Sequence, residues 1–289
     1  MVEKIKTNNH IFHAIDGKTL AENLLLELRA KIIQTKITPG LAVILVGDDE
    51  PSKLYVRNKE KACLKVGIDF HKYVCEKETE NQIIKMIEFL NDDPAISGII
   101  VQLPLPKHLD TKKIIDAIDP KKDADGFHPK NIENILAGKS KAYPPLVQTV
   151  LRLIESENID LREKNVVVLS QSKVFSPIML KALENEGAQA KTVWLKSGEE
   201  IKKFDIIIVA LGKPGCLVGN MIKKDAVVID IGITKTETGF KGDADFESVS
   251  KVASAATPTP GGVGPVTVAM LLKSTFDLAS YNSPHSKRG

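Results

Sequence analysis

The stretch VVVLSQSKVFSP, Val166 to Pro177, decides the fold class of this 289-residue chain. Its first four residues are apolar and mostly β-branched, which is typical of a strand buried on both faces of a parallel sheet. The polar residues after them predict a turn, and a helix is expected to start near Pro177. A strand that passes through a turn into a helix opens a βαβ unit, and such units build parallel sheets.

The same alternation continues on both sides of this stretch. Further short apolar runs predict strands at Leu41–Val46, Gly98–Leu103, Lys191–Leu195, Ile206–Leu211 and Val227–Ile233. Helical spacing of apolar residues predicts helices at Leu20–Ile33, Ser52–Val66, Asn81–Leu90, Thr111–Ile118, Val147–Glu155, Ile178–Glu186 and Val266–Ala279. Strands that alternate with helices predict a doubly wound α/β architecture.

Two segments look like joints between domains. Lys139–Pro145 is punctuated by proline, and Thr257–Pro265 has the sequence TPTPGGVGP. We therefore expect an N-terminal α/β domain of residues 1–146 plus 266–289, and a Rossmann-like domain of residues 147–265. The last helix is expected to pack back on the first domain, and the polar tail after Tyr281 is expected to fray.

The composition excludes several classes of function. The 40 Lys and Arg residues nearly balance the 37 Asp and Glu residues, so neither nucleic acid nor an anionic membrane is an expected partner. No apolar run has the length of a membrane span, and residues 1–16 lack a signal-peptide pattern. The three cysteines lie far apart without metal-ligand spacing, which predicts reduced thiols in a cytoplasmic protein.

Ser52, Tyr55 and Lys59 form the first candidate site. Tyr55 and Lys59 are four residues apart in a predicted helix and therefore share a face. A lysine partly withdrawn from water beside an aromatic ring can have a lowered pKa and take part in proton transfer. Taken alone, the pattern favours a solvated helix face, because basic residues surround it and Y-x-x-x-K is common by chance.

Two loops supply further candidates. Gln102 in VQLPLP follows an apolar strand, where ligands bind in open α/β sheets, although a strand-end residue facing solvent fits equally well. In KKDADGFHP, Asp125 could accept two N–H donors of a heterocycle, or Asp123 and Asp125 could build an Asx turn. His128 is expected to be structural. No metal is expected, because no further carboxylate or histidine cluster completes a ligand set.

The second domain lacks the dinucleotide-binding pattern G-x-G-x-x-G. Ser170, Gln171 and Ser172 occupy the position of the phosphate turn, where backbone N–H groups at a helix start can hold an anion. Without glycine, the close approach of a pyrophosphate is sterically harder. The loop Thr257–Pro265 could let a flat ligand approach the main chain, or serve as a hinge, or do both.

Taken together and in this order, the motifs resemble the bifunctional methylene-tetrahydrofolate dehydrogenase/methenyl-tetrahydrofolate cyclohydrolase family. The matching segments extend from about Asp16 to Thr275 and are SKLYVRNKEKACLKVGI, SGIIVQLPLP, DPKKDADGFHPKNI, VALGKPG, IKKDAVVIDIGI, GDADF and ATPTPGGVGPVTVAML. Each segment alone is a weak signal, whereas the combination is highly specific.

The resemblance implies a folate-binding catalytic first domain, an NAD(P)-binding second domain and a homodimer. It implies oxidation of 5,10-methylene-tetrahydrofolate with NADP, NAD being possible, and hydrolysis to 10-formyl-tetrahydrofolate in one-carbon metabolism and purine biosynthesis. The implied catalytic residues are Lys59, Tyr55, Gln102 and Asp125. The implied substrate-binding residues are Ser52, Tyr55, Gln102, Leu103, Asp125, Pro260, Gly261, Gly262 and Val263. The implied cofactor-binding residues are Ser170, Gln171, Ser172 and Ile233.

The sequence departs from the family pattern on the cofactor side. The family's usual G-R-S or G-A-S turn corresponds to Ser170-Gln171-Ser172, and no arginine is present there for a ribose 2′-phosphate. A folate-binding paralogue with a degenerate cofactor site, cyclohydrolase-only or non-catalytic, is the alternative hypothesis. A short-chain dehydrogenase also uses Y-x-x-x-K but is excluded by order, because its glycine-rich turn precedes the tyrosine and lysine.

Overall fold

The computed structural model describes residues 4–7, 10–193, 201–237 and 239–282, which fall into two compact units. The small-sheet unit comprises Glu22–Pro145 and Val268–Gly289, and the large-sheet unit comprises Met1–Ala21 and Leu146–Thr267. Helices α1 (Gly17–Thr35) and α9 (Val263–Asn282) each contribute residues to both units. None of the helices in the described part of the chain is long and apolar enough to cross a membrane.

The small-sheet unit is built on three parallel strands in the order β4-β3-β5. Its strands are β3 (Gly40–Val46), β4 (Asp69–Cys75) and β5 (Gly98–Val101). Besides the parts of α1 and α9 that belong to it, its helices are α2 (Glu50–Val66), α3 (Glu80–Asp92), α4 (Thr111–Asp116) and α5 (Pro129–Leu136).

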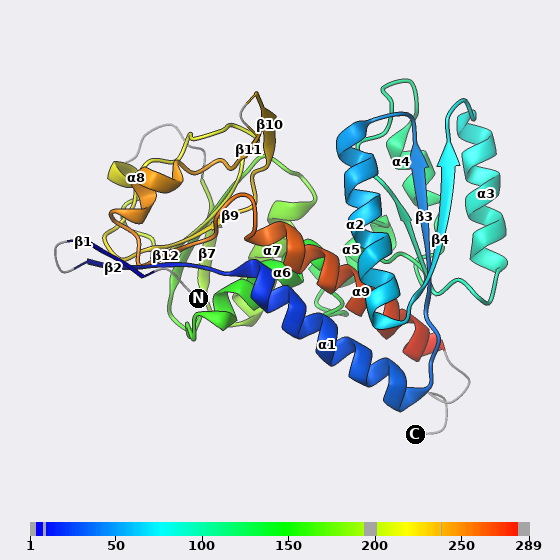
Figure 1. Ribbon diagram of the computed structural model, residues 1–289, viewed down its shortest axis with the longest axis horizontal. Helices are drawn as coiled ribbons and strands as arrows, with labels where there is room; N and C mark the ends of the chain where they lie inside the picture. Colours follow the sequence, from blue (N-terminus) through cyan, green and yellow to red (C-terminus); the bar gives the residue numbers. More distant parts are fainter. Residues whose placement is uncertain (1–3, 8–9, 194–200, 238, 283–289) are drawn as a thin grey trace. The chain divides into compact units, whose positions relative to one another are not determined.

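Both faces of this sheet are covered, as the apolar runs predict. Every residue of β3 is buried. Ala42 and Ile44 pack with Ile83 and Ile87 of α3 and with Ile114 of α4. Helix α2 contacts β3 and β4 and lies on the other side of these strands from α3 (Figure 1). Because β3 and β5 are parallel, their carboxyl ends lie at the same edge of the sheet. Polar residues of the loops that follow these strands can come together at this edge.

The large-sheet unit has seven strands in the order β1-β2-β12-β9-β8-β6-β7. These are β1 (Lys4–Thr7), β2 (His10–Ala14), β12 (Ala255–Ala256), β9 (Val227–Asp230), β8 (Ile206–Ala210), β6 (Asn165–Ser170) and β7 (Gln189–Thr192). Only β1 is antiparallel to its neighbour. The remaining elements are α6 (Pro145–Ser156), α7 (Phe175–Asn185), α8 (Phe246–Ser250), a 3₁₀ turn (Gly219–Met221) and a hairpin of β10 (Thr234–Thr236) and β11 (Gly239–Lys241).

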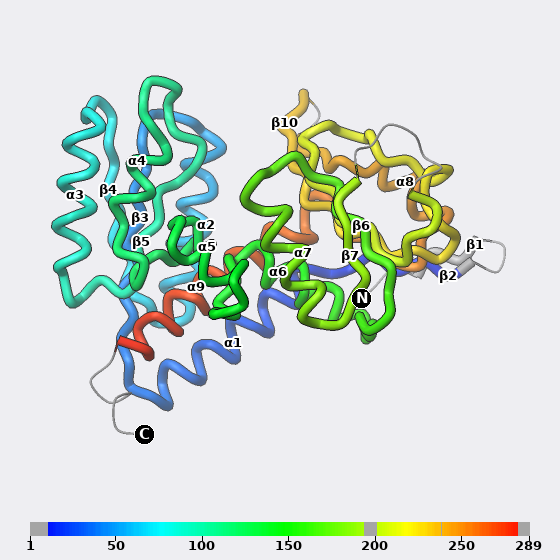
Figure 2. Tube along the Cα trace, turned by 180° about the vertical axis from the view of Figure 1, so that it is seen from behind, coloured from blue at the N-terminus to red at the C-terminus, as the bar shows by residue number. Residues whose placement is uncertain are grey.

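The strand order changes direction next to β6. Strand β7 pairs on one side of β6, and β8, which follows β7 in the chain, pairs on the other side. Helix α7 connects β6 to β7 and packs against both, as the view from behind shows (Figure 2). In open α/β sheets, ligands bind outside the carboxyl ends of the strands at such a switch point. The loops after β6 and β8 therefore flank the expected nucleotide crevice.

The N-terminal segment differs from the expected division into domains. Residues up to Ala21 group with the large-sheet unit, because β2 pairs in parallel with β12, matching His13 to Ala255. Phe12 anchors this strand, since it is buried in the large-sheet core and meets the ring of Phe246 edge-on at 5.6 Å. The polar mixture around Phe12 gave no periodic signal that could have predicted this strand.

Other boundaries also differ from the sequence prediction. Strand β4 was not predicted, because it is a half-exposed edge strand with polar side chains. Strand β9 was predicted to reach Ile233 but ends at Asp230, whose side chain accepts a hydrogen bond from Gly232 N. Helix α9 begins at Val263, inside the predicted loop. Part of the predicted strand Lys191–Leu195 and most of the tail after Tyr281 lie outside the described residues.

The last helix packs where it was expected. From Val268 onward, α9 belongs to the small-sheet unit. Thr275 lies against Gly98 at the start of β5, where an added Cβ would come within 3.3 Å of its methyl group. Asn282 Nδ2 donates a hydrogen bond to the carbonyl oxygen of Lys121.

Gly40 tests how tightly the small sheet is packed. A Cβ added at Gly40 would lie 2.0 Å from the carbonyl oxygen of Ala95, which is main chain and cannot rotate away. We expect Gly40→Ala to lower the free energy of unfolding, measured by urea titration, by about 1–3 kcal/mol. Gly264→Ala is the matched control, because nothing lies within 4 Å of its added Cβ, and it should be neutral or slightly stabilising. Equal effects of the two substitutions would contradict this packing.

Candidate active site

Helix α2 carries the first candidate residues and is fixed at both ends. The Asp49 side chain accepts a hydrogen bond of 2.8 Å from Ser52 N at the amino end, and Gly67 closes the helix with φ of 88°. Ser52 lies in the first turn of this helix, and its side chain is buried. Tyr55 and Lys59 are both half-buried rather than solvated. The solvated-face interpretation, which the sequence alone favoured, is therefore not what the structure shows.

Gln102 directs one oxygen at the lysine. Its backbone N–H donates to Ile44 O, and its Nε2 donates to Leu103 O, both at 2.8 Å. The other polar atom of its side chain, Oε1, accepts a 2.8 Å hydrogen bond from Lys59 Nζ. Because both ends of the carboxamide are engaged, the orientation of Gln102 is set by its partners. The Lys59 amine is thereby held at the carboxyl end of β5.

The pKa values of Lys59 and Asp125 move toward each other. Burial lowers the pKa of Lys59, while the charges of Asp125 and Cys63 partly oppose this shift. Burial raises the pKa of Asp125 to about 6, Lys59 lowers it and Asp123 raises it further. Burial thus disfavours the charged form of both groups, which is a common property of groups that transfer protons in active sites. The same burial raises the pKa of Tyr55.

The two aspartates of the KKDADGFHP loop have different roles. Asp123 is buried and accepts hydrogen bonds from the backbone N–H groups of Gly126, Phe127 and His128 and from the Asn131 amide. This matches the turn-building interpretation. Asp125 accepts no hydrogen bond from any described residue, so its oxygens are available to a ligand. His128 is structural, as expected, because it caps α5 by accepting from Lys130 N.

The glycine-rich loop Pro260–Val263 belongs to the large-sheet unit. Gly261 has φ of 108°, a conformation that side chains with a Cβ rarely adopt. Gly262 is confined by the main chain, because its Cβ would lie 2.7 Å from Pro258 O. Gly17, at the start of α1, sits against the Gly262 carbonyl in the same way. The backbone geometry thus requires glycine at both Gly261 and Gly262. Val263, the next residue, begins α9.

The phosphate turn is occupied by the chain's own hydroxyl groups. Ser170 Oγ accepts a hydrogen bond of 3.1 Å from Ser172 N. Ser172 Oγ accepts hydrogen bonds from Phe175 N at 3.0 Å and from Val174 N at 3.4 Å, which caps the start of α7. Gln171 is exposed. A phosphate placed at this helix end would have to displace the Ser172 hydroxyl from these amides.

The loop after β8 lies at the same edge of the sheet as the phosphate turn, and the predicted site did not include it. Gly212 and Gly215 have φ of 65° and 67°, and nothing lies within 4 Å of a Cβ added to either. The glycines of VALGKPG were a signal that could have marked this loop. Ile233, predicted from the resemblance, follows β9 and is 47% exposed. The loops after β6, β8 and β9 thus all lie at the carboxyl edge of the parallel sheet.

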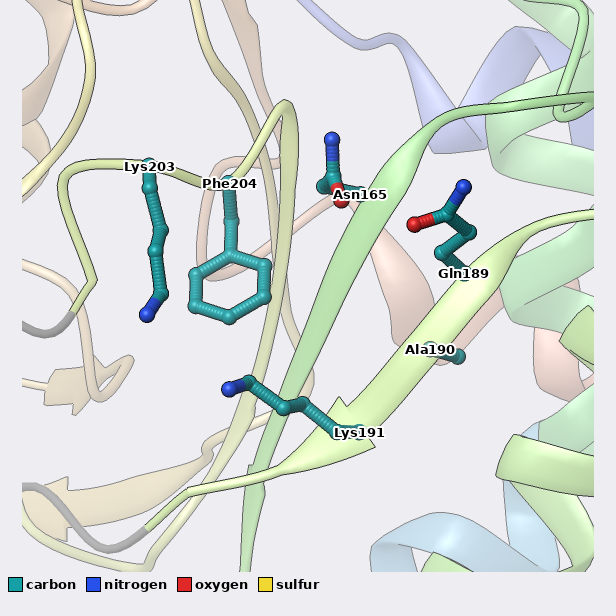
Figure 3. Close-up of a pocket in the computed structure, with 6 residues that line it drawn as sticks. All are labelled: Asn165, Gln189, Ala190, Lys191, Lys203 and Phe204. Carbon is teal, nitrogen blue, oxygen red and sulfur yellow. The ribbon is translucent and has the colours of Figure 1, made fainter.

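An open cavity of about 370 Å³ lies at the opposite edge of the sheet (Figure 3). It is lined by Asn165, Gln189, Ala190, Lys191, Lys203 and Phe204. Asn165 and Gln189 are the first residues of β6 and β7, so this cavity is at the amino ends of the strands. It is not the switch-point crevice. Across the described ranges, no three His, Cys, Asp or Glu side chains are grouped so as to hold a metal ion.

Comparison with known proteins shows similarity along both units. The catalytic domain of the tetrahydrofolate dehydrogenase/cyclohydrolase family matches residues 15–125, and its NAD(P)-binding domain matches residues 144–283. The bifunctional protein FolD of Nautilia profundicola is 44% identical over 274 residues, covering 92% of this chain and 96% of that protein. The corresponding protein of Helicobacter hepaticus is 42% identical with the same coverage.

Solved structures show the same similarity. The bifunctional FolD enzyme of Campylobacter jejuni has a TM-score of 0.89 and 38% identity, covering 93% of this chain and 99% of that chain. The FolD enzyme of Trypanosoma brucei, solved with an NADP cofactor and an inhibitor, has a TM-score of 0.88 and 31% identity, covering 96% and 98%. With both domains matched and these identities over nearly the whole length, the chain belongs to the tetrahydrofolate dehydrogenase/cyclohydrolase family.

Proposed function

We propose that this chain oxidises 5,10-methylene-tetrahydrofolate with a nicotinamide nucleotide and hydrolyses the methenyl product to 10-formyl-tetrahydrofolate. The observation that carries the proposal is the Lys59 amine, held by Gln102 and placed within electrostatic reach of the unsatisfied Asp125 carboxyl group. Family membership supplies the reaction class. Both domains of the family are matched, so nothing favours the alternative of a folate-binding paralogue without a cofactor site.

The folate would bind to the small-sheet unit through an aromatic surface and a carboxylate. Tyr55 offers its half-buried ring for stacking on the flat pterin. Asp125 has no protein hydrogen-bond donor among the described residues and can accept two N–H groups from the pterin edge. Ser52 and Leu103 flank these residues in α2 and after β5.

The hydrolytic step needs a group that takes and returns a proton. Water attacks the bridging carbon of the methenyl compound, and a neutral Lys59 amine accepts the proton that the water loses. The protonated lysine then returns that proton to the ring nitrogen as the bond between this nitrogen and the carbon breaks. The hydroxyl group left on the carbon releases its own proton to solvent as the formyl C=O bond forms, so the cationic methenyl compound gives the neutral 10-formyl product and one proton. Burial, which lowers the pKa of Lys59, favours the neutral amine that this step requires. Gln102 keeps that amine in place.

The large-sheet unit fits a nicotinamide nucleotide at its switch point. Ser170, Gln171 and Ser172 after β6, the open glycines after β8 and Ile233 after β9 would surround it. When bound, the nucleotide supplies hydride acceptance, and the protein supplies orientation. We propose NADP as the partner, with NAD possible, because Lys173 could act as a point charge for a 2′-phosphate in the absence of arginine.

The assembly and location of the protein follow as further proposals. We propose a homodimer that acts in the cytoplasm, with its product supplying one-carbon units for purine biosynthesis. We keep the expected two-domain division but assign residues 1–21 to the large-sheet unit. The small-sheet unit would carry the folate chemistry, and the large-sheet unit, now including the N-terminal strands, would carry the nucleotide.

Lys59→Met tests the hydrolytic role. Loss of the amine should lower the rate of methenyl-tetrahydrofolate hydrolysis by at least about 100-fold, which is the usual contribution of a positioned acid–base group. The absorbance of the methenyl compound follows the reaction, and a thermal melt checks that the variant is folded. Lys61→Met is the matched control, because Lys61 is an exposed lysine on the same helix. Near-normal hydrolysis by folded Lys59→Met protein would refute the role.

Asp125→Ala tests the folate anchor. The variant should bind tetrahydrofolate about 1.5–3 kcal/mol more weakly, as is typical of hydrogen bonds to a charged group, while nucleotide affinity stays unchanged. Because the pKa of Asp125 is raised to about 6, its carboxylate is lost as the pH falls below that value. Folate affinity of the unaltered protein should therefore fall at acidic pH. Asp125→Asn should remove that part of the pH dependence, and calorimetry that finds it unchanged would refute the assignment.

Restoring the phosphate turn tests the cofactor side. We expect NADP to bind weakly, because Ser170 places a Cβ at the turn and Ser172 already caps the α7 amides. The double variant Ser170→Gly, Gln171→Arg should tighten NADP by about tenfold, since a guanidinium pairs with a 2′-phosphate. NAD, which lacks that phosphate, should gain only from the Ser170→Gly change. Tight NADP binding by the unaltered protein, or no gain in the variant, would show that other residues hold the nucleotide.

A further inference from the structure

Two buried aspartates meet behind the carboxyl edge of the large sheet. Asp230 ends β9, and Asp243 belongs to the GDADF motif, and their side chains are 3% and 0% exposed. Asp230 Oδ1 accepts hydrogen bonds from Gly232 N and Asp243 N, and its Oδ2 accepts from Ala244 N. Asp230 thereby holds the segment that carries Asp243 against the end of β9.

Asp243 in turn holds the loop after β8. Its carboxylate accepts hydrogen bonds from three successive backbone N–H groups, those of Leu211, Gly212 and Lys213, at 2.9 Å from Gly212 and 2.7 Å from Lys213. A second contact supports the same loop, because Gly215 N donates to Gly242 O at 3.1 Å. Three consecutive amides of the loop are therefore satisfied by a single side chain.

The neighbouring glycines show how closely the two carboxylates are packed. A Cβ at Gly242 would lie 2.0 Å from Asp230 Oδ2, and a Cβ at Gly232 would lie 2.3 Å from Asp243 Cγ. Both glycines are needed to let the aspartates approach. The motifs DIGI and GDADF thus form one packed unit, although neither aspartate was among the predicted site residues.

We propose that Asp243 is a positioning residue for the nicotinamide nucleotide. It holds the loop Leu211–Lys213 in the shape that forms one wall of the crevice between the ends of β6 and β8. Because the three amides point inward to Asp243, the loop presents to the ligand the open side of Gly212 and the exposed Lys213. The inference rests on the proposed dehydrogenase function, since it concerns the same nucleotide site.

Holding this loop requires a carboxylate at position 243, and a side chain of the same size and shape is not sufficient. An aspartate has acceptor oxygens on both branches, whereas an asparagine would turn an N–H₂ group toward at least one of the three N–H donors. Burial raises the pKa of Asp230 to about 6, although the hydrogen bonds that it accepts from backbone N–H groups lower it, and the nearby Asp243 carboxylate adds to the rise. Asp243→Asn should therefore loosen the loop while preserving side-chain volume.

The test compares Asp243→Asn with Asp245→Asn in the full-length protein. The control residue lies two positions away, caps α8 by accepting from Ser248 N, and accepts no hydrogen bond from the loop after β8. Asp243→Asn should raise the KM for NADP about tenfold or more, with kcat at saturating nucleotide changed far less. Methenyl hydrolysis, which needs no nucleotide, should be nearly retained. Asp245→Asn should leave all three quantities unchanged.

Amide hydrogen exchange gives a second readout that does not depend on activity. In the nucleotide-free native protein, the amides of Leu211, Gly212 and Lys213 should exchange slowly, and Asp243→Asn should accelerate them selectively. Fast exchange of these amides in the native protein would overturn the proposal even if the variant does not fold. The proposal would also be overturned if folded Asp243→Asn protein had an unchanged KM for NADP, or if it lost dehydrogenase and hydrolytic activity to the same extent. Failure of the proposed function is distinguishable, because the native protein would then itself neither bind nucleotide nor oxidise the folate.

Discussion

Buried carboxylates that accept backbone N–H groups hold the functional loops of both units. Parallel strands end at a common edge, and the loops that follow them carry peptide groups that have left the sheet's hydrogen-bond ladder. An unpaired buried N–H group costs about 1–3 kcal/mol, and a buried carboxylate without donors costs more. In this chain, loop N–H groups donate hydrogen bonds to the carboxylates of Asp123, Asp230 and Asp243, so that both partners are satisfied. These aspartates are 6%, 3% and 0% exposed.

The proposed catalytic pair is defined by contrast with these structural carboxylates. Asp123 has a full set of donors, whereas Asp125, two residues later, has none among the described residues and has its pKa raised to about 6. Lys59 is half-buried, and within the described part of the chain its amine donates to one neutral acceptor, Gln102 Oε1. Polar groups that the protein leaves unsatisfied in a partly buried place are suited to bind and transfer protons.

The nucleotide side shows that shape alone does not locate a site. The 370 Å³ cavity at the amino ends of β6 and β7 is flanked by Lys191 and Lys203, both near the Phe204 ring, but it lies away from the switch point. At the carboxyl edge, the start of α7 is capped by Ser172 and the loop after β8 is held by Asp243. Both loops are thus set by internal hydrogen bonds, which leaves limited main-chain capacity for a phosphate.

The sequence by itself determined the parallel α/β architecture, because short apolar runs such as those of β3, β6 and β8, alternating with helical patterns, are typical of strands covered on both faces. It also determined that Tyr55 and Lys59 share a helix face, since helical spacing is a local property. Edge strands such as β4 were missed, because half-exposed strands mix polar and apolar residues. Only the tertiary structure decided that Asp123 is structural, that Asp125 accepts no hydrogen bond from the described residues, and that Asp243 holds a loop 30 to 32 residues earlier in the chain. The physical reason is that a carboxylate's role depends on which donors surround it, and those donors are brought together by folding rather than by spacing along the sequence.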